Sequence, residues 1–357
     1  MADDYYNTDD HTRVARDGLW TFTRDLFIAM GMNKEDAGIE ADVLIWANVR
    51  GVDSHGVQLL SMYIDNVEQG TMNCRPDVEV VQESAATMLV EADRSFGPPV
   101  TVFTMNRLME KAKQTGIGWG LIRNLTHQGA MAYYTELAAR RDMAGIAFVC
   151  NPPNMAPTGA RKAGVHNSPL AIGVPTGDGS MLYDIATSVA AGGKIRVAQD
   201  KRISIPEEWA LDENGDPTTD PDLAKYVRPF GGYKGYGMAL MFETLSSLMM
   251  GRPLLSPWTH EHEDRPSMYS QNSVVAAIDI ATFTDPEQYK KDVDDTIAGI
   301  KGLPRQDEAK EIMVPGDPEK ATEKDRLTNG IPLPVGTVEK IFAAAEQFSL
   351  DLPPELA

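Results

Sequence analysis

Residues 118–149 read GWGLIRNLTHQGAMAYYTELAARRDMAGIAFV, and their pattern decides the fold class. The stretch opens with a short apolar run of strand length at 118–122 and continues into a helical pattern at 130–140. The further apolar runs of strand length are residues 146–149, 170–174 and 181–185. Short apolar runs that alternate with helical stretches are typical of a sheet covered by helices. We therefore predict an α/β fold.

The segments on either side of this stretch add further helices and strands. The helices expected upstream are residues 12–29, a helix that Asn33 caps, residues 56–67 and residues 97–114. The strands expected upstream are residues 78–81 and 87–91. Downstream we expect a loop at 205–221, a helix at 238–250, a strand at 274–280, and a charged helical tail from 286 with loops at 302–305 and 314–318.

The composition limits the classes of partner. The 357 residues carry 33 Lys and Arg against 52 Asp and Glu, which gives a formal net charge of −19. This charge opposes non-specific binding to nucleic acid or to an anionic membrane surface, although one small anionic ligand can still be held in a local nest of N–H groups. The length fits two domains, or one α/β body with a helical satellite.

The sequence also bears on the compartment. Two cysteines, Cys74 and Cys150, are too few for a disulfide framework and indicate a reducing compartment. No apolar run reaches the roughly 18–20 residues of a membrane span. Residues 1–6 lack the basic and apolar regions of a signal peptide. We expect a cytoplasmic protein that acts on a small molecule, with no nucleic-acid or membrane partner.

The common nucleotide-binding motifs are absent from the sequence. It contains neither GxGxxG nor GxxxxGK[ST], so the Rossmann fingerprint and the P-loop are excluded. The glycine-rich segment 232–237 carries Lys234 and opens a helix, which is compatible with a phosphate cradle. By itself this pattern favours a plain helix-entry loop.

Histidines near expected loops are the candidates for chemistry. His55 follows Ser54 at the start of an expected helix, where the positive potential favours the neutral imidazole that can accept a proton from an alcohol. A plain N-cap at Asp53 or Ser54 is the default alternative. His127 lies between an expected strand and helix, at a corner where α/β proteins place ligands, and a turn histidine bonded to backbone is equally compatible. Asp184 ends another strand and can hold a ribose hydroxyl or cap a helix.

No metal site is expected. Residues 260–264 read HEHED, which lacks HExxH spacing and an obvious third ligand, so they indicate a solvated loop.

Six segments taken together resemble the type-2 malate/L-lactate dehydrogenase family, which is unrelated to the Rossmann lactate dehydrogenases. They are residues 50–57, 127–130, 184–188, 205–212, 217–221 and 232–237. The resemblance implies an oxidoreductase that uses NAD or NADP and interconverts 2-hydroxy and 2-oxo acids, or reduces cyclic imino acids. It also implies a homodimer, and a non-Rossmann nucleotide-binding α/β domain with a mixed sheet (76–300) beside a helical domain built from both chain ends (1–75 and 301–357).

The resemblance assigns roles by position. Ser54 and His55 match the catalytic pair of the family, and in some members the histidine at the position of His127 is the acid/base. The positions that match cofactor contacts are His127, Gln128, Gly129, Ala130, Met131, Asn151, Asp184, Ile185, Ala186, Lys234, Gly235, Pro315, Gly316 and Asp317.

Two departures from the family pattern fall on the substrate side. Members commonly have an arginine that binds the substrate carboxylate at the position of Leu59, and Gly-Thr-Asn-Pro where residues 166–169 read HNSP. Gln58, His166 or Asn167 can supply replacement contacts, so the resemblance implies a substrate other than ordinary malate or lactate. A cyclic imino acid reductase and a catalytically silent nucleotide-binding homologue remain alternatives; the retained His55, His127 and Lys234 argue against the silent protein.

Overall fold

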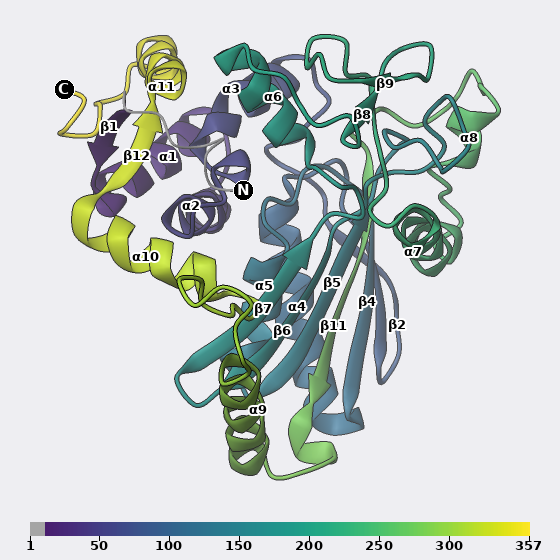
Figure 1. The fold of residues 1–357 in the computed structure, drawn as a ribbon. Helices are drawn as coiled ribbons and strands as arrows, with labels where there is room; N and C mark the ends of the chain where they lie inside the picture. The colour runs from purple at the N-terminus through teal and green to yellow at the C-terminus, as the bar shows by residue number, and fades with distance from the viewer. Residues whose placement is uncertain (1–10) are drawn as a thin grey trace.

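A seven-stranded mixed sheet forms the centre of the computed structural model, which describes residues 11–357 (Figure 1). Its strands, in spatial order, are β2 (Glu79–Glu83), β3 (Thr87–Glu91), β4 (Ile117–Leu125), β11 (Gln271–Asp279), β5 (Met143–Cys150), β6 (Leu170–Thr176) and β7 (Gly179–Ile185). The pair β3–β4 is parallel and all other neighbours are antiparallel. The predicted α/β class with a mixed sheet is confirmed, and residues 1–6, where no signal peptide is expected, lie outside the described residues.

Helices cover both faces of this sheet. Ala147 and Val149 of β5 pack in the cluster that also contains α4 (Gly97–Thr115) and α5 (Ala132–Ala139). Phe148 and Cys150 point to the opposite face, where the Phe148 ring stacks on Phe242 of α7 (Tyr233–Glu243) at 4.5 Å between centroids. Alternation along the strand therefore separates the two layers.

A glycine in the sheet allows the close approach of a covering helix. A Cβ added at Gly118 of β4 would lie 2.3 Å from the carbonyl oxygen of Leu108 in α4. Any larger residue would push α4 away from the sheet.

The two ends of the described chain meet in one helical part (Figure 1). The helices α1 (Arg16–Ala29), α2 (Lys34–Val49), α3 (Leu60–Glu68) and α11 (Val335–Phe348) share an apolar cluster. Strand β1 (His11–Val14) pairs antiparallel with β12 (Ile331–Pro334). Helix α10 (Asp317–Asn329) contacts α2, and α9 (Pro286–Lys301) packs against β6. The division at residues 75 and 300 stays a prediction.

Three local expectations were wrong in their bounds. Residues 12–14 form a strand, not the first turn of a helix, because they pair with β12 more than 300 positions away. Helix α7 begins at Tyr233 rather than 238, so Lys234 and Gly235 lie in its first turn, and residues 244–248 form a π-helical turn. The expected loop at 205–221 contains the short strands β8 (Ala210–Leu211) and β9 (Pro217–Thr218), which join β10 (Tyr226–Val227).

Two further helices were not expected from the sequence. They are α6 (Gly192–Lys201) and α8 (Ser256–Thr259). Among residues 11–357, no helix combines the length and the hydropathy that crossing a membrane requires.

Candidate active site

A cavity of about 810 Å³ lies between the helical part, β7 and α6, and it collects most of the predicted site residues. The predicted residues on its wall are Ser54, His55, Leu59, His127, Gln128, Gly129, Ala130, Met131, Asn151, His166, Asn167, Asp184, Ile185, Ala186 and Gly316. Segments more than 250 positions apart thus contribute to one cavity.

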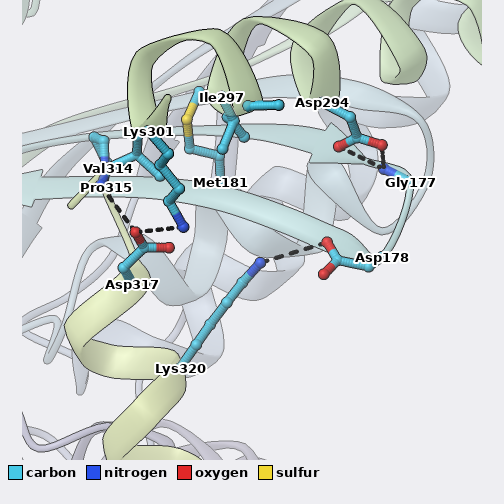
Figure 2. Close-up of a pocket in the computed structure, with 11 residues that line it drawn as sticks. Gly177, Asp178, Met181, Asp294, Ile297, Lys301, Val314, Pro315, Asp317 and Lys320 are labelled. Atoms are coloured by element: carbon cyan, nitrogen blue, oxygen red, sulfur yellow. Dashed lines mark hydrogen bonds and ion pairs between the residues drawn. The ribbon is translucent and has the colours of Figure 1, made fainter. Parts of the chain in front are cut away.

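Five predicted residues do not line this cavity. Gln58 lies off its wall, Lys234 is exposed on α7, and Gly235 is buried against the carbonyl oxygens of Thr187 and Phe230. Pro315 and Asp317 line a second cavity of about 530 Å³ between α9, the first turn of α10 and the β6–β7 turn, which Figure 2 shows.

The second cavity has charged walls that are already paired. Lys301 lies 2.8 Å from Asp317, and Lys320 lies 3.6 Å from Asp178 (Figure 2). Gly316 lines the first cavity while its two neighbours line the second. The loop that carries Gly316 therefore separates the two cavities.

Ser54 and His55 sit on a short 3-10 helix, Asp53–His55, that two helices hold in place. Both carboxylate oxygens of Asp53 accept hydrogen bonds from Arg326 of α10, at 2.6 and 2.9 Å. Asn48 of α2 donates to Asp53 at 2.7 Å and accepts the backbone N–H of Val57 at 2.8 Å. The catalytic candidates are therefore positioned by an ion pair from α10 to Asp53 and by the Asn48 amide of α2.

His127 follows β4, and its hydrogen bonds indicate its tautomer. The backbone N–H of Gly129 donates to Nδ1 at 3.2 Å, so Nδ1 carries no proton. The hydroxyl of Tyr63, 2.7 Å from the same nitrogen, must then also donate. The proton of the neutral ring is therefore on Nε2, which makes His127 a hydrogen-bond donor on that side.

His55 lies against His127 and has a different partner. The two rings stack with centroids 5.5 Å apart and planes 24° apart. Ser54 Oγ lies 3.0 Å from His55 Nδ1. When Nδ1 donates to this hydroxyl, Nε2 of His55 is free to accept a proton.

Both histidines are neutral at neutral pH. Desolvation by the surrounding protein, together with the positive charge of Arg196, lowers the pKa of His55 to about 4. Desolvation, followed by His55 and Arg196, lowers the pKa of His127 to about 3. Desolvation also lowers the pKa of His166 to about 3. The cavity thus presents imidazoles in the form that can accept or share a proton.

Asp184 caps a helix, which was one of its two predicted roles, and it also lines the cavity. Its Oδ2 accepts the backbone N–H of Ala132 at 2.8 Å, at the first turn of α5. The side chain is accessible from the cavity, yet the surrounding protein desolvates it and raises its pKa to about 6. Asp184 therefore supports α5 from β7.

Several buried polar atoms on the wall have no hydrogen-bond partner among the described residues. They are Arg50 Nε, Gln128 Oε1, Asn151 Oδ1, His166 Nδ1 and Gln271 Oε1. Such atoms are costly when buried without a partner. A ligand with amide and hydroxyl groups, as a nicotinamide nucleotide has, fits this wall.

Two residues of the site were missed by sequence reasoning. Tyr63 lies in α3, 64 positions from His127, and only the fold shows their contact. Arg196 lies on α6, where no helix was expected, and belongs to none of the quoted motifs. Leu59 faces the cavity but is only 7% exposed, so this position provides no cation.

Comparison with known proteins identifies the family. Residues 14–342 match the family described as malate/L-lactate dehydrogenase. The chain is 33% identical to the malate dehydrogenase of Pyrococcus horikoshii, over 98% of this chain and 99% of that protein. It is 32% identical to the L-sulfolactate dehydrogenase of Methanothermobacter thermautotrophicus, over 92% and 95% of the two chains.

The likeness extends to solved structures. The crystal structure of malate dehydrogenase from Entamoeba histolytica aligns with a TM-score of 0.90 at 26% identity, covering 96% of this chain and 100% of that chain. A match over nearly the whole length leaves no large segment outside the shared fold. The chain therefore belongs to the malate/L-lactate dehydrogenase family, and it is a dehydrogenase/reductase.

Proposed function

We propose that the protein moves a hydride between the nicotinamide of NAD or NADP and a 2-hydroxy or 2-oxo acid, and that ordinary malate and lactate are not its substrates. The observation that carries the reaction type is the stacked pair of neutral imidazoles, His55 and His127, on the wall of one cavity. The apolar side chain of Leu59 supports the second part, because it cannot bind a carboxylate.

The two histidines divide the proton chemistry. Nε2 of His55 takes the proton of the substrate hydroxyl during oxidation and returns it during reduction. Ser54 orients this ring through Nδ1. His127 donates its Nε2–H to the substrate oxygen and polarises it, because Tyr63 and Gly129 occupy Nδ1. The nicotinamide, when bound, accepts or supplies the hydride.

We assign the cofactor to the wall formed by the residues after β4 and at the end of β7. Gln128 and Asn151 provide buried oxygens that can accept hydrogen bonds from it, and Gly316 permits approach to the loop before α10. Four further cofactor contacts are proposed from the resemblance alone. They are Lys234 and Gly235, which lie off this wall, and Pro315 and Asp317, which line the second cavity.

Tryptophan-quenching titrations with NADH and NADPH test the cofactor directly. We expect one nucleotide to bind the wild-type protein and the His55→Ala variant with similar affinity, because His55 is assigned to the proton and not to the cofactor. The variant should lose about 10²- to 10⁴-fold in kcat. If neither NADH nor NADPH binds, the oxidoreductase proposal is contradicted.

A substrate panel tests the second part of the proposal. Malate, lactate, other 2-hydroxy acids, 2-oxo acids and Δ1-piperideine-2-carboxylate are offered with the nucleotide that binds. Efficient turnover of malate or lactate, above ~10⁴ M⁻¹s⁻¹ in kcat/KM, would contradict the inference from Leu59. Turnover of the cyclic imino acid alone would favour the imino acid reductase, and no turnover at all would favour a silent homologue.

We also propose a cytoplasmic homodimer, from the resemblance and from two features of the chain. The thiols of Cys74 and Cys150 are free, as in a reducing compartment. Exposed apolar side chains lie along α7 and the π-helical turn, namely Leu240, Met241, Leu245, Leu248 and Met249. A second copy of the chain would cover them. Light scattering that finds a monomer would contradict this proposal.

A further inference from the structure

Among the residues that the structure describes, three cations border the cavity, and they differ in how they are engaged. They are Arg50, Lys194 and Arg196. Arg50 is only 5% exposed, pairs with Glu323 at 2.8 Å and lies over the ring of Trp46. Its charge is compensated by Glu323 and only its buried Nε–H lacks a partner, so it is a poorer candidate than an exposed, unpaired cation to bind an anionic substrate.

Arg196 is exposed on α6 and borders the cavity. Among the described residues, no carboxylate pairs with it and no hydrogen bond involves its guanidinium. Its positive charge nevertheless lowers the pKa of both His55 and His127. The guanidinium therefore lies near the two imidazoles while remaining available to a ligand.

Lys194 is less well placed for the same task. It lies two residues earlier on α6, which puts it about 200° around the helix from Arg196. Its charge is not among the causes of the pKa shifts of the two histidines. Of these two cations, Arg196 is thus the one that shares the cavity wall with both imidazoles and whose charge acts on them.

The geometry of a 2-hydroxy acid requires a cation near the acid/base histidine. Its carboxylate is bonded to the carbinol carbon, so a group that binds the carboxylate must lie within a few ångströms of the acid/base histidine. The planar guanidinium matches a carboxylate with two parallel hydrogen bonds. Leu59, which also lines the cavity, cannot perform this task.

We propose that Arg196 binds the substrate carboxylate, so that the acid enters with its carboxylate toward α6 and its other substituent toward Leu59. This rests on the proposed function. Leu59 and Met62 belong to one apolar cluster and both line the cavity, which gives it an apolar region at position 59. The substrate class is therefore a 2-hydroxy or 2-oxo monocarboxylic acid with an uncharged, apolar substituent larger than the methyl group of lactate, rather than a dicarboxylic acid.

Binding of the anion also adjusts the acid/base group. A carboxylate paired with Arg196 neutralises the charge that disfavours protonated imidazole. The pKa of His55 then rises when the substrate is bound, which allows it to retain the proton taken from the hydroxyl.

The test uses oxamate, an unreactive analogue of a 2-oxo monocarboxylic acid, titrated into protein loaded with its reduced nucleotide. We expect Arg196→Ala to weaken oxamate binding by about 10- to 100-fold while the nucleotide binds as in the wild type. Arg196→Lys should lose less, because it keeps the charge without the planar fork. Arg202→Ala, which removes an exposed arginine just after α6, is the matched control and should change nothing.

A compensating double variant distinguishes direct binding of the carboxylate by Arg196 from a purely structural role of this residue. Adding Leu59→Arg to Arg196→Ala should recover at least part of the oxamate affinity, because it places a guanidinium on the wall of the same cavity. In a matched substrate comparison, 2-oxo-4-methylpentanoate should be reduced with a lower KM than oxaloacetate, and Arg196→Ala should raise that KM.

The pH profile provides a second readout. Arg196→Gln should move the acid limb of kcat/KM to higher pH, because removing the cation raises the pKa of the free-enzyme histidines. Unchanged oxamate affinity in Arg196→Ala, or no oxamate binding by the nucleotide-loaded wild type, would overturn the proposal. Failure to bind any nucleotide would instead contradict the proposed function itself.

Discussion

Tyr63 fixes the chemistry of His127 from within the apolar core. Its ring is fully buried against Phe27 and Phe96, while its hydroxyl reaches Nδ1 of His127. The backbone N–H of Gly129 also donates to Nδ1, which makes this nitrogen an acceptor. A residue outside every recognised motif thus determines which nitrogen of a motif residue faces the substrate.

We expect Tyr63→Phe to lower kcat by roughly tenfold and to reduce the free energy of unfolding by about 1 kcal/mol. The phenylalanine ring keeps the packing, but Nδ1 loses its hydroxyl donor, so the Nε2–H tautomer is held by Gly129 alone. Nitrogen chemical shifts of labelled histidine should report Nε2–H in the wild type and a mixture in the variant. An unchanged kcat together with an unchanged tautomer would contradict this role.

Functional residues could be predicted from the sequence only where they belong to a recognisable motif. Ser54, His55 and His127 were candidates because of their positions between expected elements, and they lie on one cavity wall. Tyr63 and Arg196 could not be found in this way, because nothing local distinguishes a core tyrosine or a surface arginine from a functional one. Their contacts exist only after α3, β4 and α6 come together.

At the scale of the element, the 3-10 helix that carries His55 depends on the side chain of Asn48. This amide bridges Asp53 and the backbone N–H of Val57, and it passes directly over Gly56. A Cβ added at Gly56 would lie 2.2 Å from Asn48 Oδ1, which is too close for any real contact. The glycine is required by this close approach.

Gly56→Ala should therefore displace Asn48 and shift the Asp53–His55 segment. We expect kcat to fall by at least tenfold, because a displacement of about 1 Å can cost two orders of magnitude in rate. Gly38→Ala in α2 is the control: nothing lies within 4 Å of its added Cβ, and alanine favours a helix. If the two variants are equally active, Asn48 can move without displacing His55, and the prediction is wrong.

Elements with a local pattern could be predicted, and elements that depend on distant partners could not. The apolar runs and helical periods gave β4 to β7, α4 and α5 close to their observed positions, and Asn33 caps α2 through the backbone N–H of Asp36 at 2.9 Å. Strand β1 exists because β12 pairs with it, so the local helical pattern of residues 12–14 was misleading. Helix α7 includes glycines that local propensity places in a loop.

At the scale of the whole molecule, the site depends on contacts between the chain ends and the sheet. Arg326 of α10 holds Asp53, and Gly316 before α10 borders the cavity that His55 shares with β7. The order of strands in the sheet and the position of α10 could not be read from residue patterns, because they depend on non-local packing. The family resemblance, by contrast, implied both the mixed sheet and the return of the C-terminal segment.

Enclosure of the histidines in this cavity links the stability of the whole fold to pH. The pKa of His166 is about 3 in the folded protein and 6.5 in the unfolded chain. Between these values the unfolded chain takes up a proton that the folded protein does not, so stability falls as pH decreases below 6.5. His55 and His127 act in the same direction. The raised pKa values of Asp184 and Glu40 act in the opposite direction, since their folded forms take up protons first.

A comparison of His166→Gln with the wild type isolates one of these contributions, because Asp184 and Glu40 are common to both proteins. His166 Nδ1 has no partner among the described residues, so the substitution breaks no hydrogen bond at that atom. Lowering the pH from 7.5 to 5.5 should reduce the free energy of unfolding of the wild type by up to about 1.4 kcal/mol more than that of the variant, since one pH unit below the unfolded pKa corresponds to this energy. Denaturant unfolding at the two pH values measures the difference. Parallel losses in both proteins would mean that His166 is protonated in the folded state, which the enclosed wall of the cavity disfavours.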